Sequence, residues 1–129
     1  MNDRPDAGEL LRAVERFLES DVVPALDSVH RFHARVAANV VAIVARELET
    51  QEPHLRSEWE GLSRLLDDPS PLPEGIAAQR AAIIHRNEEV VRRIRAGAAD
   101  EGPWREALLA HLEGVVAHKL EVSHPPRQR

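Results

Sequence analysis

The sequence predicts an all-α protein, folded as a compact up-and-down bundle of about five helices, four longer and one short. Apolar residues recur at helical spacing in five segments, and no segment shows sustained alternation of apolar and polar residues. The proline-rich stretch DDPSPLPEG, at 67–75, marks an interior loop. With 129 residues and no internal repeat, the chain is expected to form a single domain, 1–129, with frayed ends at roughly 1–5 and 123–129.

The first two predicted helices run from about residue 6 to 20 and from about 28 to 51. Asp6 and Glu9 have the spacing of a capping box at the start of the first helix. Pro24 either breaks the chain or lies in the first turn of the second helix, and Pro53 is expected to end that helix. The second helix is expected to be central, with one broad apolar arc turned inward: Phe32, Val36, Ala37, Val40, Ile43, Val44 and Leu48.

Three further helices are predicted. A short helix from about Pro53 to Leu66 carries an apolar stripe that includes Trp59 and Leu62. The fourth runs from about 76 to 96, where Gly97 is a natural stop, and the fifth begins at Pro103. The apolar residues expected to face inward on these last two helices are Ile83, Ile84, Val90, Val91, Ile94, Trp104, Leu108, Leu112, Val115, Val116 and Leu120.

Composition and charge restrict the expected function. The chain has no cysteine and its N-terminal stretch has no signal-peptide pattern, so a cytoplasmic protein is expected. The most apolar window, at 36–45, is too short to span a bilayer, which predicts no membrane association. A net charge of -5 and few aromatic residues argue against nucleic acid as a partner.

Polar residues stand where the helical pattern favours aliphatic ones. His33 and Glu47 fall within the apolar arc of the second helix, and Asn87 and Lys119 fall within the apolar faces of the fourth and fifth. Because a buried polar group without a partner costs a few kcal/mol, we predict that these groups form one interior network. The predicted network comprises His33, Glu47, Asn87 and Lys119, with Asn39 and Arg80 at its margins.

Two interpretations of this network are open. It can fix the register of a repetitive bundle, with Lys119 extending along the helix face to solvent. Alternatively, it lines a pocket for a small anionic ligand, with Lys119 and Arg80 as the counter-charges.

No catalytic signature is present. The chain lacks a G-x-S-x-G motif, a P-loop and a glycine-rich strand-to-helix turn, so the sequence predicts no catalytic residues, although an enzyme is not excluded. Asp27, His30 and His33 are spaced three residues apart, and successive members diverge by about 60° around a helix. Neither a metal site nor another cofactor is predicted.

Four stretches carry a family resemblance: RPDAGELLRAVERFLESDVVPAL, FHARVAANVVAIVARELE, RRIRAG and HLEGVVAHKLEVSHP. They resemble domain-of-unknown-function family 6285, a bacterial helical family, nearly from end to end. The FHARVAAN stretch, at 32–39, is the most specific, whereas His124 stands where the family pattern has asparagine. The positions that match the pattern are Phe32, His33, Arg35, Asn39, Arg95, Lys119 and Leu120.

The resemblance implies a function through neighbouring proteins and supplies no catalytic residues. Family members are encoded beside aminoglycoside-phosphotransferase-like kinases and acyl-CoA dehydrogenases, which implies a non-catalytic accessory or interaction protein that serves such a pair. The alternative is a small-molecule binding domain that holds an acyl-CoA or a phosphorylated acyl compound on the interior polar network. A third hypothesis is a homodimer that uses Trp59, Trp104 and the edges of the bundle.

Overall fold

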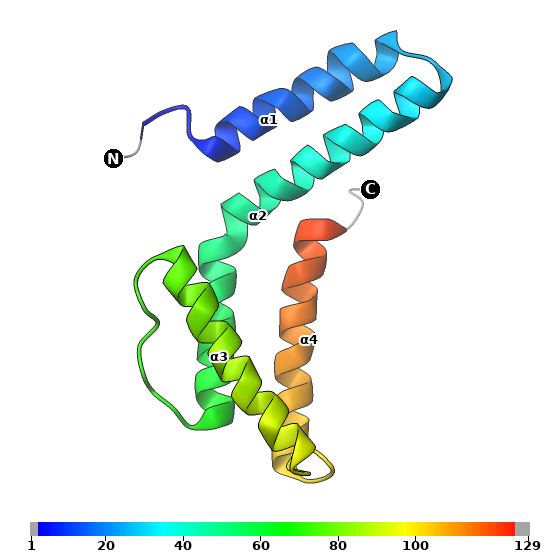
Figure 1. Ribbon diagram of the computed structural model, residues 1–129. Coiled ribbons are helices and arrows are strands. Elements are labelled where there is room, and N and C mark those ends of the chain that lie inside the picture. Colours follow the sequence, from blue (N-terminus) through cyan, green and yellow to red (C-terminus); the bar gives the residue numbers. More distant parts are fainter. Residues whose placement is uncertain (1–2, 126–129) are drawn as a thin grey trace. The chain divides into compact units, whose positions relative to one another are not determined.

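The computed structural model describes residues 3–125, and all the secondary structure in this range is helical (Figure 1). Its elements, in chain order, are α1 (Ala7–Phe17), the π-helical turn η1 (Leu18–Val22), the 3-10 turn η2 (Val23–Ala25), α2 (Ser28–Leu66), α3 (Ile76–Arg95) and α4 (Pro103–Ser123). The prediction of an all-α fold is therefore confirmed. No helix in this range combines the length and the hydropathy needed to cross a membrane.

The prediction of five helices is wrong, because the second and third predicted helices are one continuous helix, α2. Pro53 lies inside α2 and does not end it. Proline lacks the N–H that would bond the carbonyl of Glu49, so this turn loses one hydrogen bond while the turns on either side keep theirs. Pro24 lies before α2, in the 3-10 turn η2.

Apart from Pro53, the predicted helix ends named next are confirmed. Asp6 caps α1, because its side chain accepts a hydrogen bond from the Glu9 N–H (2.8 Å) and the Glu9 carboxylate accepts one from the Asp6 N–H (2.9 Å). The stretch 67–75 is a loop, α4 begins at Pro103, and α3 ends just before Gly97, whose φ of 91° favours glycine.

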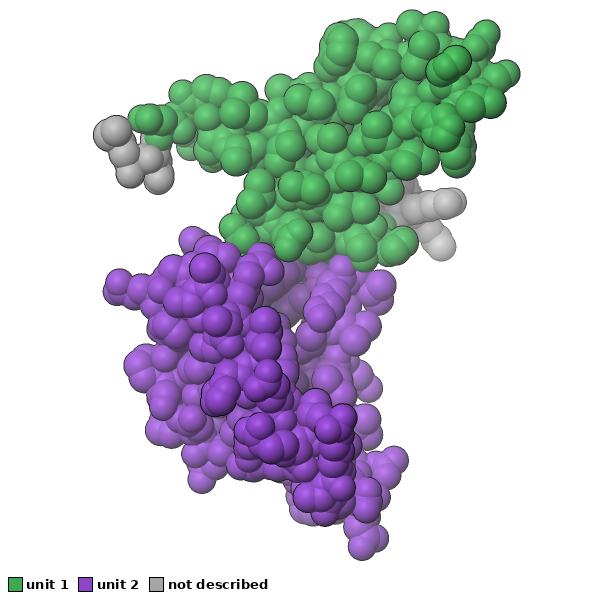
Figure 2. Space-filling model, in the orientation of Figure 1, with its two compact units in different colours: residues 1–51, 122–129 green, residues 52–121 purple. Residues whose placement is uncertain are grey.

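The chain divides into two compact units, which Figure 2 shows in different colours. Unit 1 comprises residues 1–51 and 122–129, and unit 2 comprises residues 52–121. The single domain at 1–129 stays a prediction, and its predicted frayed ends fall partly on residues 1–2 and 126–129, which lie outside the described residues.

Unit 1 is a helical hairpin in which α1 runs antiparallel to the first part of α2 (Figure 1). The side chains that this part of α2 buries are all small: Ala34, Ala38, Ala42 and Ala45. Val23, in the turn between the helices, is buried as well. Arg12 of α1 donates two hydrogen bonds to the Glu49 carboxylate, at 2.9 and 3.0 Å, and these tie α1 to α2. The same guanidinium lowers the pKa of Glu49 below its usual range.

The predicted inward face of the second helix is wrong. Phe32 is 64% exposed and Val40 is 52% exposed, whereas Ala38 is 3% exposed. Val40 follows Ala38 by two residues, which places it about 200° further around the helix. The first part of α2 therefore packs with its alanine face, and its bulkier apolar face is turned away from α1.

Unit 2 contains the last part of α2, all of α3 and most of α4, and it holds the main apolar core. Leu62, on the part of α2 that belongs to unit 2, is fully buried. Trp59 and Trp104 donate from their indole nitrogens to the carbonyls of Ser70 (3.0 Å) and Leu65 (2.9 Å), which holds the 67–75 loop and α4 against α2. The buried core residues are Leu55, Trp59, Leu62, Leu65, Ile83, Val90 and Leu108.

The inward faces predicted for the last two helices are correct only in part. Ile83, Val90 and Leu108 are buried, and Trp104 and Val115 are half-buried. The remaining predicted core residues of α3 and α4 are exposed: Ile84, Val91, Ile94, Leu112, Val116 and Leu120. The buried face of α3 instead includes Arg86, which is 5% exposed. This face is therefore rotated around the helix from the purely aliphatic face that the pattern favours.

Candidate functional site

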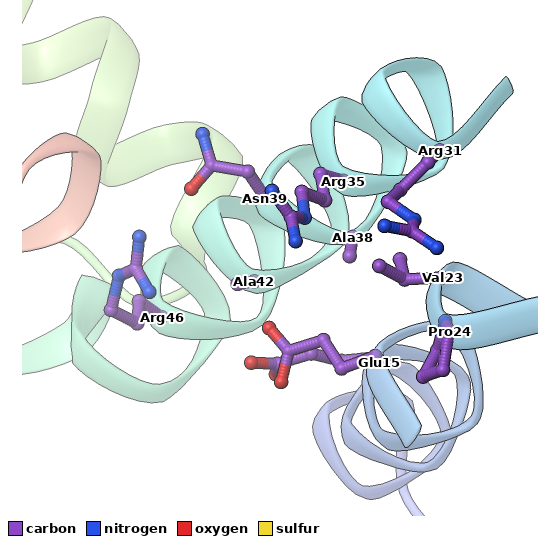
Figure 3. Close-up of a pocket in the computed structure, with 10 residues that line it drawn as sticks. Glu15, Val23, Pro24, Arg31, Arg35, Ala38, Asn39, Ala42 and Arg46 are labelled. Atoms are coloured by element: carbon purple, nitrogen blue, oxygen red, sulfur yellow. The ribbon is translucent and has the colours of Figure 1, made fainter. Parts of the chain in front are cut away.

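A polar groove in unit 1 has a volume of about 710 Å³, and charged side chains converge on it from both of its walls (Figure 3). Arginine and asparagine side chains reach it from α2, and glutamates reach it from the end of α1 and from η1. Ala38 and Ala42 lie between them, and these small side chains leave the space open. The lining residues are Glu15, Glu19, Val23, Pro24, Arg31, Arg35, Ala38, Asn39, Ala42 and Arg46.

Two of the three arginines are positioned by the main chain. Arg31 donates from Nε to the Leu26 carbonyl (2.8 Å), and Arg46 donates from Nε to the Val122 carbonyl (2.7 Å). Such a bond orients the guanidinium plane and leaves both Nη groups able to donate to a ligand. Because guanidinium groups match planar or tetrahedral oxyanions, these two side chains suit a carboxylate or a phosphate.

Arg35 and Asn39 lie between these two arginines, one helical turn apart on α2. Both side chains are exposed, and among residues 3–125 the Arg35 side chain has no hydrogen-bond or ion-pair partner. Both also belong to the FHARVAAN stretch. The positively charged wall of the groove thus contains a guanidinium and an amide that are available to a ligand.

The opposite wall is acidic, but one of its carboxylates is already paired. Glu15 accepts a hydrogen bond from Arg12 Nη1 (2.6 Å), and Arg12 is not part of the lining. Glu19 is exposed. The three arginines therefore exceed the carboxylate charge that remains, and the groove favours an anion, with Glu19 able to accept from a hydroxyl group of the same ligand.

The six predicted site residues are divided between the two units. His33, Asn39 and Glu47 belong to unit 1, and Arg80, Asn87 and Lys119 belong to unit 2. Asn87 is half-buried, whereas His33, Glu47 and Lys119 are exposed, so the predicted placement of these three on buried faces is wrong. Asn39 is the one of the six that lines the groove, and whether the six act together in binding stays a prediction.

The buried polar residue that the sequence prediction missed is Arg86. Its guanidinium lies 3.4 Å from the centroid of the Trp59 ring, and it donates to Ser63 Oγ (2.6 Å) and to the Asp68 carbonyl (3.2 Å). Its spacing of three and four residues from Ile83 and Val90 was the available signal. Because its partners lie in α2 and the following loop, Arg86 stabilises unit 2.

Histidines line the contact between α2 and α4 within unit 2. His54 stacks on His118 with ring centroids 4.3 Å apart, and His54 Nε2 lies 3.4 Å from a Glu121 carboxylate oxygen. His111 packs against Gly61, where any side chain would collide with its ring. Burial lowers the pKa of His111 below its usual 6.5, which favours the neutral ring.

No three potential metal ligands come together anywhere in residues 3–125. His111 and His118 are packing residues of the α2–α4 contact. These histidines therefore hold α2 and α4 together, and the polar groove of unit 1 is the better candidate site.

Comparison with known protein families gives a match over most of the chain. The family described as "Domain of unknown function (DUF6285)" matches residues 24–126, a range that includes Arg31, Arg35, Asn39 and Arg46 of the groove. Comparison with curated proteins and with solved structures gives no match.

Proposed function

Because the chain belongs to domain-of-unknown-function family 6285, we propose that it is a non-catalytic interaction module that serves a phosphotransferase-like kinase and an acyl-CoA dehydrogenase. Such a role needs a surface that another protein covers. The observation that carries the proposal is an uncovered row of apolar side chains on α4, in unit 2.

This row has the spacing of a helix face that packs against a partner. Leu109, Leu112, Val116 and Leu120 follow one another at intervals of three or four residues, and they are 43–53% exposed. On α3 of the same unit, Ile84 is 60% exposed. Soluble chains rarely leave contiguous apolar patches of this kind in water, and such patches mark protein interaction sites.

A charge in the middle of this row is expected to abolish the association. We predict that Val116→Asp weakens binding to a phosphotransferase-like kinase from the same source at least tenfold, because the carboxylate would have to lose its hydration at the interface. Co-expression followed by size-exclusion chromatography and titration calorimetry measures the effect.

Ala117→Asp is the matched control. Ala117 is exposed and lies about 100° from Val116 around α4, so the same charge is added beside the row and not within it. The control is expected to bind like the wild type. Separate elution of the wild type and the kinase at micromolar concentration, with kinase activity unchanged, would contradict the proposal.

A second candidate function rests on the groove of unit 1. With Arg31 and Arg46 oriented by main-chain carbonyls and Arg35 exposed between them, the groove suits an anionic small molecule. In keeping with the family, we propose an acyl-CoA or a phosphorylated acyl compound as the ligand. The volume of the groove, about 710 Å³, lies within the usual range for small-molecule sites.

Thermal-shift measurements with coenzyme A, acyl-CoAs and phosphorylated acyl compounds test this candidate. A ligand present at about 100 times its Kd stabilises the folded chain by about 2.7 kcal/mol. We predict that Arg35→Met lowers the affinity at least tenfold, whereas Arg56→Met, which removes an exposed arginine outside the groove, leaves it unchanged. Equal stabilisation of all three proteins would show that the ligand binds elsewhere.

A further inference from the structure

The bulky apolar face of α2 in unit 1 is the largest uncovered feature that the proposed function does not use. Five residues at intervals of four form a continuous row along it, and each is 39–64% exposed: Phe32, Val36, Val40, Val44 and Leu48. Val29, which is 63% exposed, lies on the same side of the helix. We call these five residues the α2 row.

The distribution of side-chain size around α2 is the reverse of what an isolated hairpin needs. Alanines fill the contact with α1, where Ala45 is fully buried, while valine and phenylalanine face solvent. A hairpin that folded only for itself would bury the larger side chains, because the gain on burial grows with apolar area. Alanines instead let α1 approach closely and leave the larger residues for a second surface.

We propose that this second surface is the α2 row of another copy of the same chain, packed antiparallel about a two-fold axis at Val40. A two-fold contact is formed by the same patch on both subunits, so the patch must be complementary to itself. The α2 row satisfies this condition. Reversal about Val40 places Val36 at the level of Val44 and Phe32 at the level of Leu48, so apolar residues meet apolar residues along its length.

The polar residues beside the row have the same symmetry. His33 and Glu47 each lie seven residues from Val40, on the apolar side of α2. In an antiparallel pair, the imidazole of His33 therefore comes level with the carboxylate of Glu47 of the other copy, and this happens twice. A hydrogen-bonding imidazole thus meets a carboxylate at both ends, whereas a parallel pair would place the two Glu47 carboxylates against each other.

The α2 row extends over about four turns of one helix, so a second copy can pack along its whole length. The dimer does not depend on the partner proposed above, because the two use different helices.

The earlier hypothesis of a dimer through the tryptophans uses residues that have other roles. Trp59 is buried beneath Arg86, and Trp104 is half-buried and bonded to the Leu65 carbonyl. Both therefore serve the packing of unit 2. The α2 row replaces them as the surface for self-association.

Cysteine cross-linking of the full chain tests the proposed axis, because the natural chain has no cysteine. A residue on a two-fold axis lies close to its own copy, so Val40→Cys is expected to give a disulfide-linked dimer as the main product of mild oxidation. Asn39→Cys is the matched control: it is exposed on the neighbouring position, about 100° away on the groove side, and is expected to give no disulfide-linked dimer. Equal cross-linking of the two variants, or none with Val40→Cys, would overturn the proposal.

Two further variants separate loss of the interface from loss of the fold. Val40→Asp is expected to weaken the dimer at least a hundredfold while retaining the helical circular dichroism of the wild type, because Val40 is exposed within the single chain. Glu47→Arg is expected to weaken the dimer, and adding His33→Glu in the same chain is expected to restore it. A folded Val40→Asp variant that dimerises as tightly as the wild type would refute the α2 row as the interface.

Discussion

Replacing Arg86 with methionine is expected to lower the free energy of unfolding of unit 2 by about 3 kcal/mol, because this change removes a buried charge from its partners. Arg86 is 5% exposed and connects α3 to two other parts of the unit: Trp59 and Ser63 on α2, and Asp68 in the following loop. Methionine fills most of the same volume, so the loss measures the guanidinium and not a cavity.

Denaturant unfolding followed by tryptophan fluorescence measures this loss in the right part of the chain. Both tryptophans lie in unit 2, and Trp59 contacts Arg86 directly. Arg86→Lys is expected to recover only part of the stability, because an ammonium group cannot bond Ser63 and the Asp68 carbonyl while it stacks on the indole. Arg95→Met, at an exposed arginine of the same helix, is expected to change the stability by less than about 0.5 kcal/mol. If Arg86→Met matched this control, the bridging role would be wrong.

Leu62→Ala is expected to cost unit 2 between about 2 and 5 kcal/mol. Leu62 is the largest side chain that is fully buried, and it lies in the core beside Trp59 and Leu65 on α2. Truncation removes apolar contacts and leaves a cavity, since helices on both sides hold the surrounding side chains in place.

Leu109→Ala provides the same chemical change at a site that is 50% exposed. Its expected cost in the isolated chain is below about 1 kcal/mol, because little buried area is lost. The same fluorescence-detected unfolding compares the two. Similar losses for both variants would mean that Leu109 is covered in the isolated chain.

The features that the sequence predicted correctly depend on a few neighbouring residues. The capping box of Asp6 and Glu9, the proline-rich loop at 67–75 and the start of α4 at Pro103 are each decided within one or two helical turns. The prediction that Pro53 ends a helix was also based on a local signal, but here the structure around the proline decides the outcome. The helix continues through this proline because the turns before and after it keep their own hydrogen bonds and packing.

The predicted helix faces failed for a different reason. A periodic pattern shows which side of a helix is apolar, but α2 has two such sides, one of alanines and one of bulkier residues. Which of them meets α1 depends on how closely the helices approach. The helical wheel weights side chains by hydrophobicity, so it favoured Phe32 and Val40 over Ala38. Arg86 was missed in the same way, because its partners come from segments distant in the sequence.

The groove of unit 1 could be predicted only in part. Asn39 was predicted at the margin of a site, and Arg35 was one of the positions that match the family pattern. Both line the groove. Arg31 and Arg46 have no signal in the sequence, because their roles come from main-chain carbonyls of Leu26 and Val122. His33 and Glu47 are exposed because the bulky face of α2, on which they were placed, is not the buried one.

Sedimentation velocity of the wild-type chain, alone and with a phosphotransferase-like kinase, tests most directly whether other protein surfaces cover the exposed apolar rows. At micromolar concentration the chain alone is expected to sediment as a dimer, with twice the 14.4 kDa mass of one copy, and to shift to a larger species with the kinase. A single 14.4 kDa species under both conditions would show that these rows remain in water, and would contradict both the dimer and the interaction module.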